Sequence, residues 1–305
     1  MIEIVELKKV FDNVTAIEGI NLKINKGEIF VILGPNGAGK TTTIRILTCI
    51  INPTEGNAYI DGMSILEEKK RIRGMSGLLT ENPGLYERFN AIENLKFFSS
   101  LYGMDERSAE EKIKYYLEKF SLWERRNDPV GNFSKGMKQK LALIRALIHD
   151  PDYIYLDEPT ASLDPETSKI VRDFIKDLKK EGKTVILSTH NLTEAEYLAD
   201  HIAVLNTRIV AFGTPDNLRR EVFGKKVVIE FTGNVDMVTK ILNEMRLNYY
   251  LDKNRIIINE PGIRNSIIVE TLVRAGVSIE YVYDESHTLE ELYLRLVNND
   301  GHKSD

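Results

Sequence analysis

The feature that most constrains the fold is the glycine-rich stretch "GPNGAGKT" at residues 34–41, together with its flanks. It fits the pattern G-x-x-x-x-G-K-[ST], follows the apolar run "IFVIL" and opens the amphipathic run "TTTIRIL". A loop between a buried strand and a helix is the context that this pattern requires. Glycines let backbone N–H groups surround a phosphate there, and the start of the helix favours negative charge. The residues expected to bind a nucleotide through this loop are Gly34, Pro35, Asn36, Gly37, Ala38, Gly39, Lys40, Thr41 and Thr42.

Individual side chains can be given roles in this chemistry. Lys40 is predicted to bridge the β- and γ-phosphates, and the Thr41 hydroxyl to ligate Mg²⁺. A second stretch, "YIYLDEP", places Asp157 and Glu158 at the carboxyl end of an apolar strand, where ligands bind in open α/β sheets. We predict that Asp157 holds Mg²⁺, directly or through water, and that Glu158 polarises an attacking water beside the γ-phosphate.

The order of the remaining patterns predicts two domains. Continuous apolar strands alternate with amphipathic helices through the first two thirds of the chain, which indicates a parallel sheet covered on both faces. After "LRREVFGKK" the pattern restarts as strand, helix, strand, strand, helix, strand and a last helix, an order typical of a ferredoxin-like α+β module. We therefore expect domains at 1–220 and 226–298, and a flexible tail at 299–305.

Composition excludes several classes of function. The formal net charge is −5 and basic residues form no long block, so we expect no nucleic-acid binding. The single cysteine, Cys49, allows no internal disulfide and is expected to be buried and inert. The N-terminus lacks the pattern of a secretory signal, and no apolar run is long enough to cross a bilayer. A cytosolic protein is expected, to which another chain would have to supply any membrane span.

A second glycine-bearing helix start lies between the two phosphate-site motifs, in "FSKGMKQK" at residues 133–140. Ser134 is a favourable N-cap, and apolar residues recur at Met137, Leu141, Ile144 and Ile148. This pattern predicts an anchored helix whose N-terminus can meet an anion.

With these motifs in this order, residues 1 to about 220 resemble an ATP-binding cassette (ABC) ATPase. "FSKGM" is similar to the family's signature, although Lys135 replaces the first of two usual glycines. The resemblance implies a P-loop NTPase core with a parallel sheet, an antiparallel β subdomain and a helical subdomain. It also implies ATP as substrate, His190 of "STH" as the γ-phosphate switch, and Phe11 stacked on adenine.

The resemblance further implies that each ATP lies between the phosphate loop of one cassette and the signature helix of another. Ser134, Gly136 and Asp164 (of "ASLD") would then contact the nucleotide of a partner, most simply in an ATP-induced homodimer. The clearest departure is Glu81, which stands where the family commonly has Gln. A carboxylate there is predicted to ligate Mg²⁺ with more charge than an amide.

The subclass implied is an exporter. "HTLEELYLRL" at residues 287–296 resembles the closing segment of ABC-2 type exporter subunits of the drug-resistance and sodium-efflux kind. This implies a separate polytopic membrane subunit, which would meet the helical subdomain near Tyr86 and Phe89, and a place at the inner face of the cell membrane. Alternatives remain open: a soluble cassette ATPase uncoupled from transport, an importer ATPase with a regulatory C-terminal domain, or a nucleotide sensor.

Overall fold

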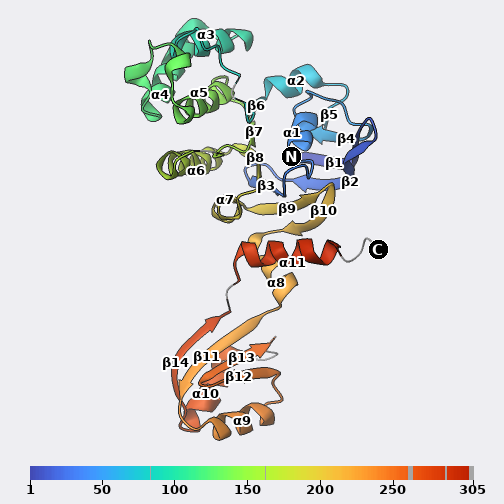
Figure 1. Cartoon of the computed structure of the whole chain (residues 1–305), viewed down its shortest axis with the longest axis vertical. Helices are drawn as coiled ribbons and strands as arrows, with labels where there is room; N and C mark the ends of the chain where they lie inside the picture. Colours follow the sequence, from blue (N-terminus) through green and yellow to red (C-terminus); the bar gives the residue numbers. More distant parts are fainter. Residues whose placement is uncertain (83, 162, 260–263, 286, 302–305) are drawn as a thin grey trace. The chain divides into compact units, whose positions relative to one another are not determined.

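The computed structural model describes residues 1–82, 84–161, 163–259, 264–285 and 287–301. The chain divides into two compact units, Met1–Thr214 and Pro215–Asp305 (Figure 1). This division falls before helix α8 (Pro215–Phe223), whereas the sequence pattern places the change between 220 and 226. The helix belongs with the second unit because Phe223 at its end stacks on His287, with ring centroids 3.8 Å apart.

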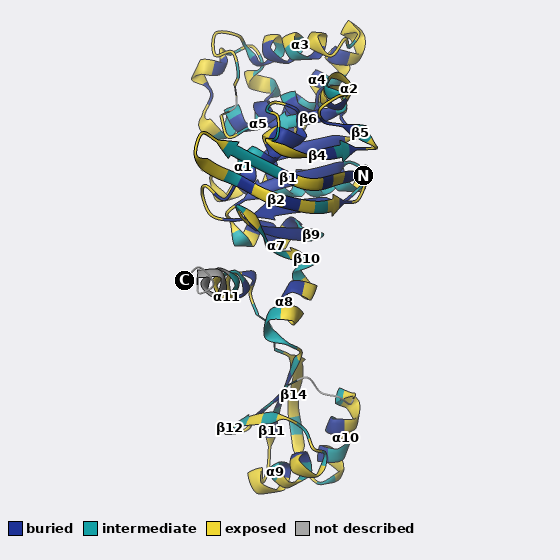
Figure 2. Ribbon diagram, turned by 90° about the vertical axis from the view of Figure 1, so that its right-hand side faces the viewer, coloured by how far each residue is buried: buried dark blue, intermediate teal, exposed yellow. Residues whose placement is uncertain are grey.

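The centre of the first unit is a six-stranded sheet in which five strands run parallel. Only the edge strand β10 is antiparallel to its neighbour. In spatial order the strands are β10 (Arg208–Gly213), β9 (His201–Asn206), β3 (Ile29–Leu33), β8 (Thr184–Thr189), β7 (Tyr153–Asp157) and β6 (Ser76–Leu79). Strands β3, β7 and β8 are buried along their whole length, which explains their continuous apolar sequences. Figure 2 shows the neighbouring strand β9 largely in dark blue, the colour of buried residues.

A second, antiparallel sheet packs on the parallel one. Its order is β2 (Val14–Ile24), β1 (Ile2–Phe11), β4 (Glu55–Ile60) and β5 (Met63–Ser64). Alternate residues such as Ile2 and Ile4 point into one core that also contains helix α1 (Lys40–Leu47) and side chains of β3 and β7. The predicted parallel core with an antiparallel subdomain is confirmed.

The remaining helices of the first unit include a helical subdomain on the far side of β6–β8 from the antiparallel sheet (Figure 1). The described helices of the first unit other than α1 are α2 (Lys69–Gly74), α3 (Ala91–Leu101), α4 (Glu106–Lys119), α5 (Lys135–Leu147), α6 (Pro165–Lys180) and α7 (Leu192–Leu198), with 3₁₀ turns at Trp123–Arg125 and Val130–Asn132. The buried residues of α3 are Ala91, Asn94, Leu95 and Ser99, and Leu101 at its end is 65 % exposed.

The second unit has the predicted order of elements. After α8 come β11 (Lys226–Thr232), α9 (Val235–Glu244), β12 (Tyr249–Asp252), β13 (Arg255–Asn259), α10 (Asn265–Arg274), β14 (Ser278–Asp284) and α11 (Leu289–Gly301). The sheet order β12-β13-β11-β14, antiparallel throughout, is that of a ferredoxin-like module with its own apolar core. Helix α11 covers the first three residues of the predicted tail, and 302–305 lie outside the described residues.

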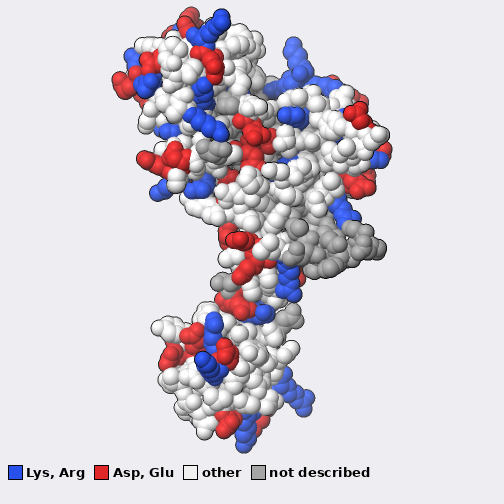
Figure 3. Space-filling model, in the orientation of Figure 1, with Lys and Arg blue, Asp and Glu red and all other residues white. Residues whose placement is uncertain are grey.

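Among the described residues, no helix combines the length and apolar character needed to cross a membrane. On the face of the molecule in Figure 3, the described Lys and Arg side chains are interspersed with Asp and Glu and form no continuous basic surface.

Candidate functional site

The phosphate loop connects β3 to α1, as the sequence predicts, and two of its glycines are required by close backbone approaches. Gly39 has φ 99°, and a Cβ there would lie 2.4 Å from the carbonyl oxygen of Ala16. A Cβ on Gly34 would lie 2.3 Å from the carbonyl oxygen of Leu205. Side chains at either position would push the loop away from the strands that support it.

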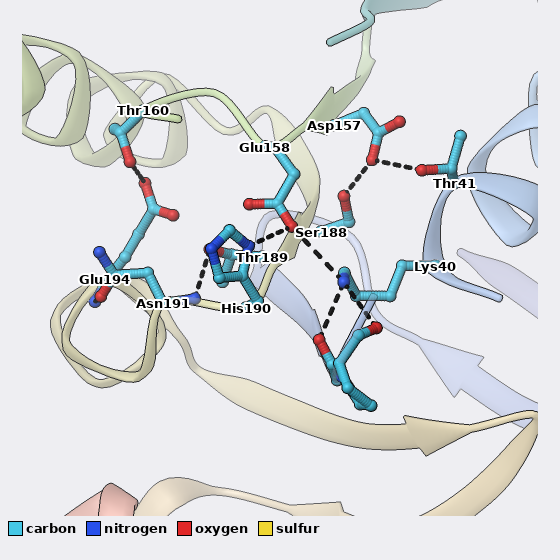
Figure 4. Close-up of polar contacts among 12 residues, drawn as sticks. Lys40, Thr41, Asp157, Glu158, Thr160, Ser188, Thr189, His190, Asn191 and Glu194 are labelled. Carbon is cyan, nitrogen blue, oxygen red and sulfur yellow. Dashed lines mark hydrogen bonds and ion pairs between the residues drawn. The ribbon is translucent and has the colours of Figure 1, made fainter. Parts of the chain in front are cut away.

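Lys40 lies beneath the loop, with a side chain only 6 % exposed. Its Nζ donates hydrogen bonds to the carbonyl oxygens of Gly34 (2.8 Å) and Pro35 (3.1 Å). It also lies 3.5 Å from Oε1 of Glu158. The ammonium group is thus held at the loop by acceptors on two sides (Figure 4).

Asp157 ends β7 and contacts the start of α1. Its Oδ1 accepts hydrogen bonds from the hydroxyls of Thr41, at 3.1 Å, and Ser188. A hydroxyl and a carboxylate side by side, next to a phosphate-binding loop, fit Mg²⁺, which takes few protein ligands and completes its shell with phosphate oxygens and water. Among the described residues, no three His, Cys, Asp or Glu side chains converge as a metal site of their own.

Glu158 begins a tight turn after the strand. It has φ 51°, a conformation that a non-glycine residue seldom adopts, and its N–H donates to the carbonyl oxygen of Ser188 at 3.0 Å. Its Oε1 lies 2.9 Å from Nδ1 of His190, which follows β8. Since the Glu158 side chain is 13 % exposed and that of His190 is 57 % exposed, the pair joins a buried carboxylate to an accessible imidazole (Figure 4).

These groups surround a cavity of about 450 Å³. It is lined by Ala16, Asn36, Gly37, Ala38, Gly39, Lys40, Thr41, Thr42, Glu81, Glu158, Ala161 and His190. The structure thus brings Glu81, which the family resemblance singled out, to the same cavity as the phosphate loop. Phe11 is not among the described residues that line it. Its ring is 44 % exposed at the end of β1, with Nζ of Lys9 4.8 Å from the ring centroid.

The signature residues lie elsewhere. Ser134 is exposed and caps α5, its hydroxyl accepting from the N–H of Met137 at 3.2 Å. Asp164 caps α6 in the same way through Thr167, and these hydrogen bonds hold the pKa of its carboxyl below the usual value. A Cβ on Gly136 would lie 3.9 Å from Oδ2 of Asp164. Ser134, Gly136 and Asp164 therefore form one exposed corner, and none of them is among the described residues that line the cavity. Ser162 of "ASLD" lies outside the described residues.

Two contacts were missed by the sequence reasoning. Ser188 donates to Asp157, and parallel pairing of β7 with β8 places these two residues in register. The "STH" motif contains that serine, so its position one strand away from Asp157 was a usable signal. Gln139 of α5 donates from Nε2 to the carbonyl oxygen of Pro159 at 3.1 Å. Nothing in the sequence pattern pointed to that contact, because it depends on how α5 packs.

Comparison with known proteins places this geometry in a family. The family described as "ABC transporter" matches residues 17–161. The chain is 40 % identical over 200 residues to "ABC transporter ATP-binding protein NatA" of Bacillus subtilis (strain 168), covering 65 % of this chain and 81 % of that protein. It is 33 % identical over 300 residues to "Daunorubicin resistance ATP-binding protein DrrA3" of Streptomyces coeruleorubidus, covering 96 % and 94 %.

A solved structure gives the same result for the fold. It is described as the dimeric structure of a post-hydrolysis state of the ATP-binding cassette MJ0796 bound to ADP and Pi, and it matches with a TM-score of 0.66 and 27 % identity, covering 70 % of this chain and 98 % of that one. Motifs, fold and extended sequence identity agree, and the chain belongs to the ABC transporter ATP-binding proteins and is an ATPase.

Proposed function

We propose that this chain is the ATP-hydrolysing subunit of an ABC exporter, acting with a separate membrane subunit. The observation that carries the catalytic part is the convergence of Lys40, Thr41, Asp157, Glu158 and His190 at the carboxyl edge of the parallel sheet. In this proposal Lys40 and the loop N–H groups bind the phosphates, and Glu158 orients and polarises the attacking water. His190, held against Glu158, contacts the γ-phosphate.

Residues that would hold Mg²⁺ are Thr41 and Asp157, which are hydrogen-bonded to each other, and Glu81, which lines the same cavity as Thr41. When bound, Mg²⁺ would neutralise charge that develops on the β- and γ-phosphate oxygens. Phe11 is proposed to stack on adenine. Its exposed ring is at the end of β1, which pairs with β2, and Ala16 of β2 lines the cavity.

We also propose that ATP binding closes two copies of the chain head to tail. Ser134 is exposed, and neither it nor Gly136 is among the described residues that line the cavity at the chain's own phosphate loop, which supports a role toward a second molecule. Helix N-termini attract anions, and the cassette MJ0796 is described as dimeric. Asp164, adjacent to this corner, would contact the partner's nucleotide as well.

The surface proposed to meet the membrane subunit is an aromatic cluster of the helical subdomain, made of Tyr86, Phe89, Phe97 and Phe98. The rings of Tyr86 and Phe89 lie 5.4 Å apart and those of Tyr86 and Phe97 5.1 Å apart. Tyr86 is 46 % and Phe89 41 % exposed. Exposed rings that already pack on one another suit a protein interface, because little side-chain entropy is lost on docking.

Export rather than import is proposed from the relative named for daunorubicin resistance, to which the similarity extends over 96 % of this chain and so includes the C-terminal unit. We propose that the C-terminal unit is a separate domain that contacts a partner, either the second copy or the membrane subunit. A place at the inner face of the cell membrane follows from this proposal.

The test is purification of the tagged chain from detergent-solubilised membranes of its host. A polytopic membrane protein recovered in stoichiometric amount is the expected result. The matched control is a Tyr86→Ser/Phe89→Ser variant, which should bind ATP normally and lose the membrane protein. Recovery from the soluble fraction alone, with or without ribosomes or nucleic acid, would contradict coupling to a transporter and leave the ATPase chemistry intact.

A further inference from the structure

A buried carboxylate close to the site has no part in the chemistry described so far. Glu194 of α7 has no exposed surface. Its Oε1 accepts a hydrogen bond of 2.7 Å from the hydroxyl of Thr160, and its Oε2 is buried without a hydrogen-bond partner among the described residues. Burial raises the pKa of this carboxyl. A buried carboxyl is costly to keep, so its contacts call for an explanation.

The contacts of Glu194 close a ring that contains both Glu158 and His190 (Figure 4). Thr160 lies two residues after Glu158, in the same turn. On the other side, the N–H of Glu194 donates to Oδ1 of Asn191 at 3.1 Å, and Asn191 directly follows His190. The ring is completed by the 2.9 Å contact between Nδ1 of His190 and Oε1 of Glu158.

The turn that carries Glu158 needs support from outside. Glu158 itself has φ 51°, a strained conformation that persists only where the surrounding structure holds it. Within the turn, the N–H of Ala161 donates to the carbonyl oxygen of Glu158 at 3.1 Å. Thr160, in the same turn, is only 9 % exposed, and its side chain is hydrogen-bonded to another element, α7.

We propose that Glu194 is a positioning residue for hydrolysis, which acts through Thr160 to hold Glu158 at its working distance from His190. The side chain does not touch the nucleotide. It ties the turn after β7 to the helix after β8, so that the water-polarising carboxylate and the γ-phosphate contact keep one relative geometry. This inference rests on the roles proposed above for Glu158 and His190.

The experiment measures steady-state ATP hydrolysis by the full chain at saturating Mg²⁺. Glu194→Ala and Thr160→Val each remove the link and should lower kcat by about tenfold or more, because small misplacements of catalytic groups have large effects on rate. KM for ATP should change less than about threefold, since the phosphate loop is untouched. Thr160→Ser keeps the hydroxyl and should recover most of the loss.

Two further variants separate positioning from simple destabilisation. The double variant Thr160→Val/Glu194→Ala should be no slower than the slower single variant, because both changes break one link. Glu196→Ala removes an exposed glutamate from the same helix and should keep the wild-type kcat. If Glu194→Ala does not fold, the comparison of Thr160→Val with Thr160→Ser still decides the question.

Three outcomes would overturn the inference: a kcat within about twofold of wild type for Thr160→Val, equal loss in Thr160→Val and Thr160→Ser, or additive losses in the double variant. A parallel Glu158→Gln measurement distinguishes this failure from that of the proposed site. If Glu158→Gln is inactive while the Thr160 variants are normal, only the role of Glu194 is withdrawn.

Discussion

The phosphate loop and the start of α5, the two regions proposed to contact a phosphate, differ in how far their side chains are already hydrogen-bonded within the chain. At the phosphate loop, Lys40 and Asp157 are buried and each is hydrogen-bonded within the chain. At the start of α5, Ser134 is exposed and its hydroxyl caps its own helix, and Gly136 has no side chain. The phosphate-loop site is organised before any ligand binds, whereas the start of α5 is a helix N-terminus whose exposed serine is engaged in capping.

This difference indicates how catalysis would be divided between two copies. Preorganised charges and dipoles lower a barrier because they need no rearrangement when the reaction occurs. The loop and the Glu158–His190 pair have this property within one chain. In the proposed dimer the start of α5 adds to them from the other copy, so binding of ATP and association of two copies would be coupled.

The largest effect on ATP hydrolysis is expected when the phosphate-loop site loses the carboxylate of Glu158. Glu158→Gln keeps the size and hydrogen-bonding capacity of the side chain but cannot polarise water as a carboxylate does. We expect hydrolysis to fall by about 10²–10⁴-fold with ATP binding retained. Light scattering should then detect dimers at saturating Mg-ATP. Persistent monomers would contradict the proposed division between the two regions, because the start of α5 would then have no partner site to complete.

The next effect tests the start of α5 directly by mixing two inactive variants. Ser134→Arg should block the approach of α5 to a partner's nucleotide and lower activity by at least about tenfold. In a mixed dimer with Glu158→Gln, one composite site regains an intact Glu158 from one chain and an intact Ser134 from the other. An equal mixture should therefore recover about a quarter of wild-type sites. Ser134→Ala should lose less activity than Ser134→Arg, since it removes the hydroxyl and about 1 kcal/mol of helix capping without blocking the approach of α5. No recovery on mixing would contradict the head-to-tail arrangement.

A third prediction sharpens the account of the loop by comparing two of its glycines. Gly39 and Gly37 both have positive φ, at 99° and 84°, but a Cβ would meet the Ala16 carbonyl only at Gly39. Gly37→Ala should destabilise by about 1–2 kcal/mol, the cost of the left-handed conformation alone. Gly39→Ala should destabilise more and weaken ATP binding, as measured by chemical unfolding and nucleotide titration. Equal effects would mean that backbone contact does not shape the loop.

Local sequence patterns predicted the residues of the phosphate-loop site, whereas contacts that depend on helix packing were not predictable. The loop, Asp157 and Glu158 lie at strand ends, and strand ends of a parallel sheet meet at one edge, so their convergence followed from order in the chain. The contact of Gln139 with Pro159 and the burial of Glu194 depend on how helices pack on that sheet. No periodicity encodes such contacts.

The helical subdomain shows the same limit. Apolar residues recur every three positions along α3, at Ile92, Leu95, Phe98 and Leu101, yet Leu101 is 65 % exposed. The buried stripe contains Asn94, whose Nδ2 donates to the carbonyl oxygens of Tyr86 and Asn90. A polar residue satisfied by backbone groups can occupy a core position, and hydrophobic periodicity does not register it.

A smaller effect is expected at Glu81, which is exposed and lines the same cavity as the phosphate loop. Glu81→Gln removes one negative charge beside Thr41 and should raise the Mg²⁺ concentration for half-maximal hydrolysis by a few-fold, about 2–5 times. Activity titrated with Mg²⁺ at fixed ATP measures this. A change in the same direction in Glu87→Gln, a glutamate that instead pairs with Lys138 at 2.6 Å, would point to general electrostatics. An unchanged Mg²⁺ dependence would remove Glu81 from the metal site.

The smallest effect concerns the C-terminal end of α5, which is packed against neighbouring side chains, whereas the start of the helix is exposed. His149 follows that helix, stacks on Tyr102 with ring centroids 3.6 Å apart, and has its Nε2 3.1 Å from the carbonyl oxygen of Ser76. Burial lowers the pKa of His149 to about 4. Between that value and the ordinary one near 6.5, the unfolded chain binds more protons than the folded one, so stability falls as pH decreases across this window.

His149→Phe keeps an aromatic ring on Tyr102 but cannot titrate, so its unfolding temperature should depend less on pH. Between pH 6.5 and 4 the wild-type protein should lose about 2–4 °C more than the variant. Differential scanning calorimetry at several pH values measures the difference directly, and the carboxylates common to both proteins cancel. Parallel curves for the two proteins would mean that His149 titrates normally in the folded chain. The end of α5 would then be as open to water as its start, and the contrast between the two ends would be lost.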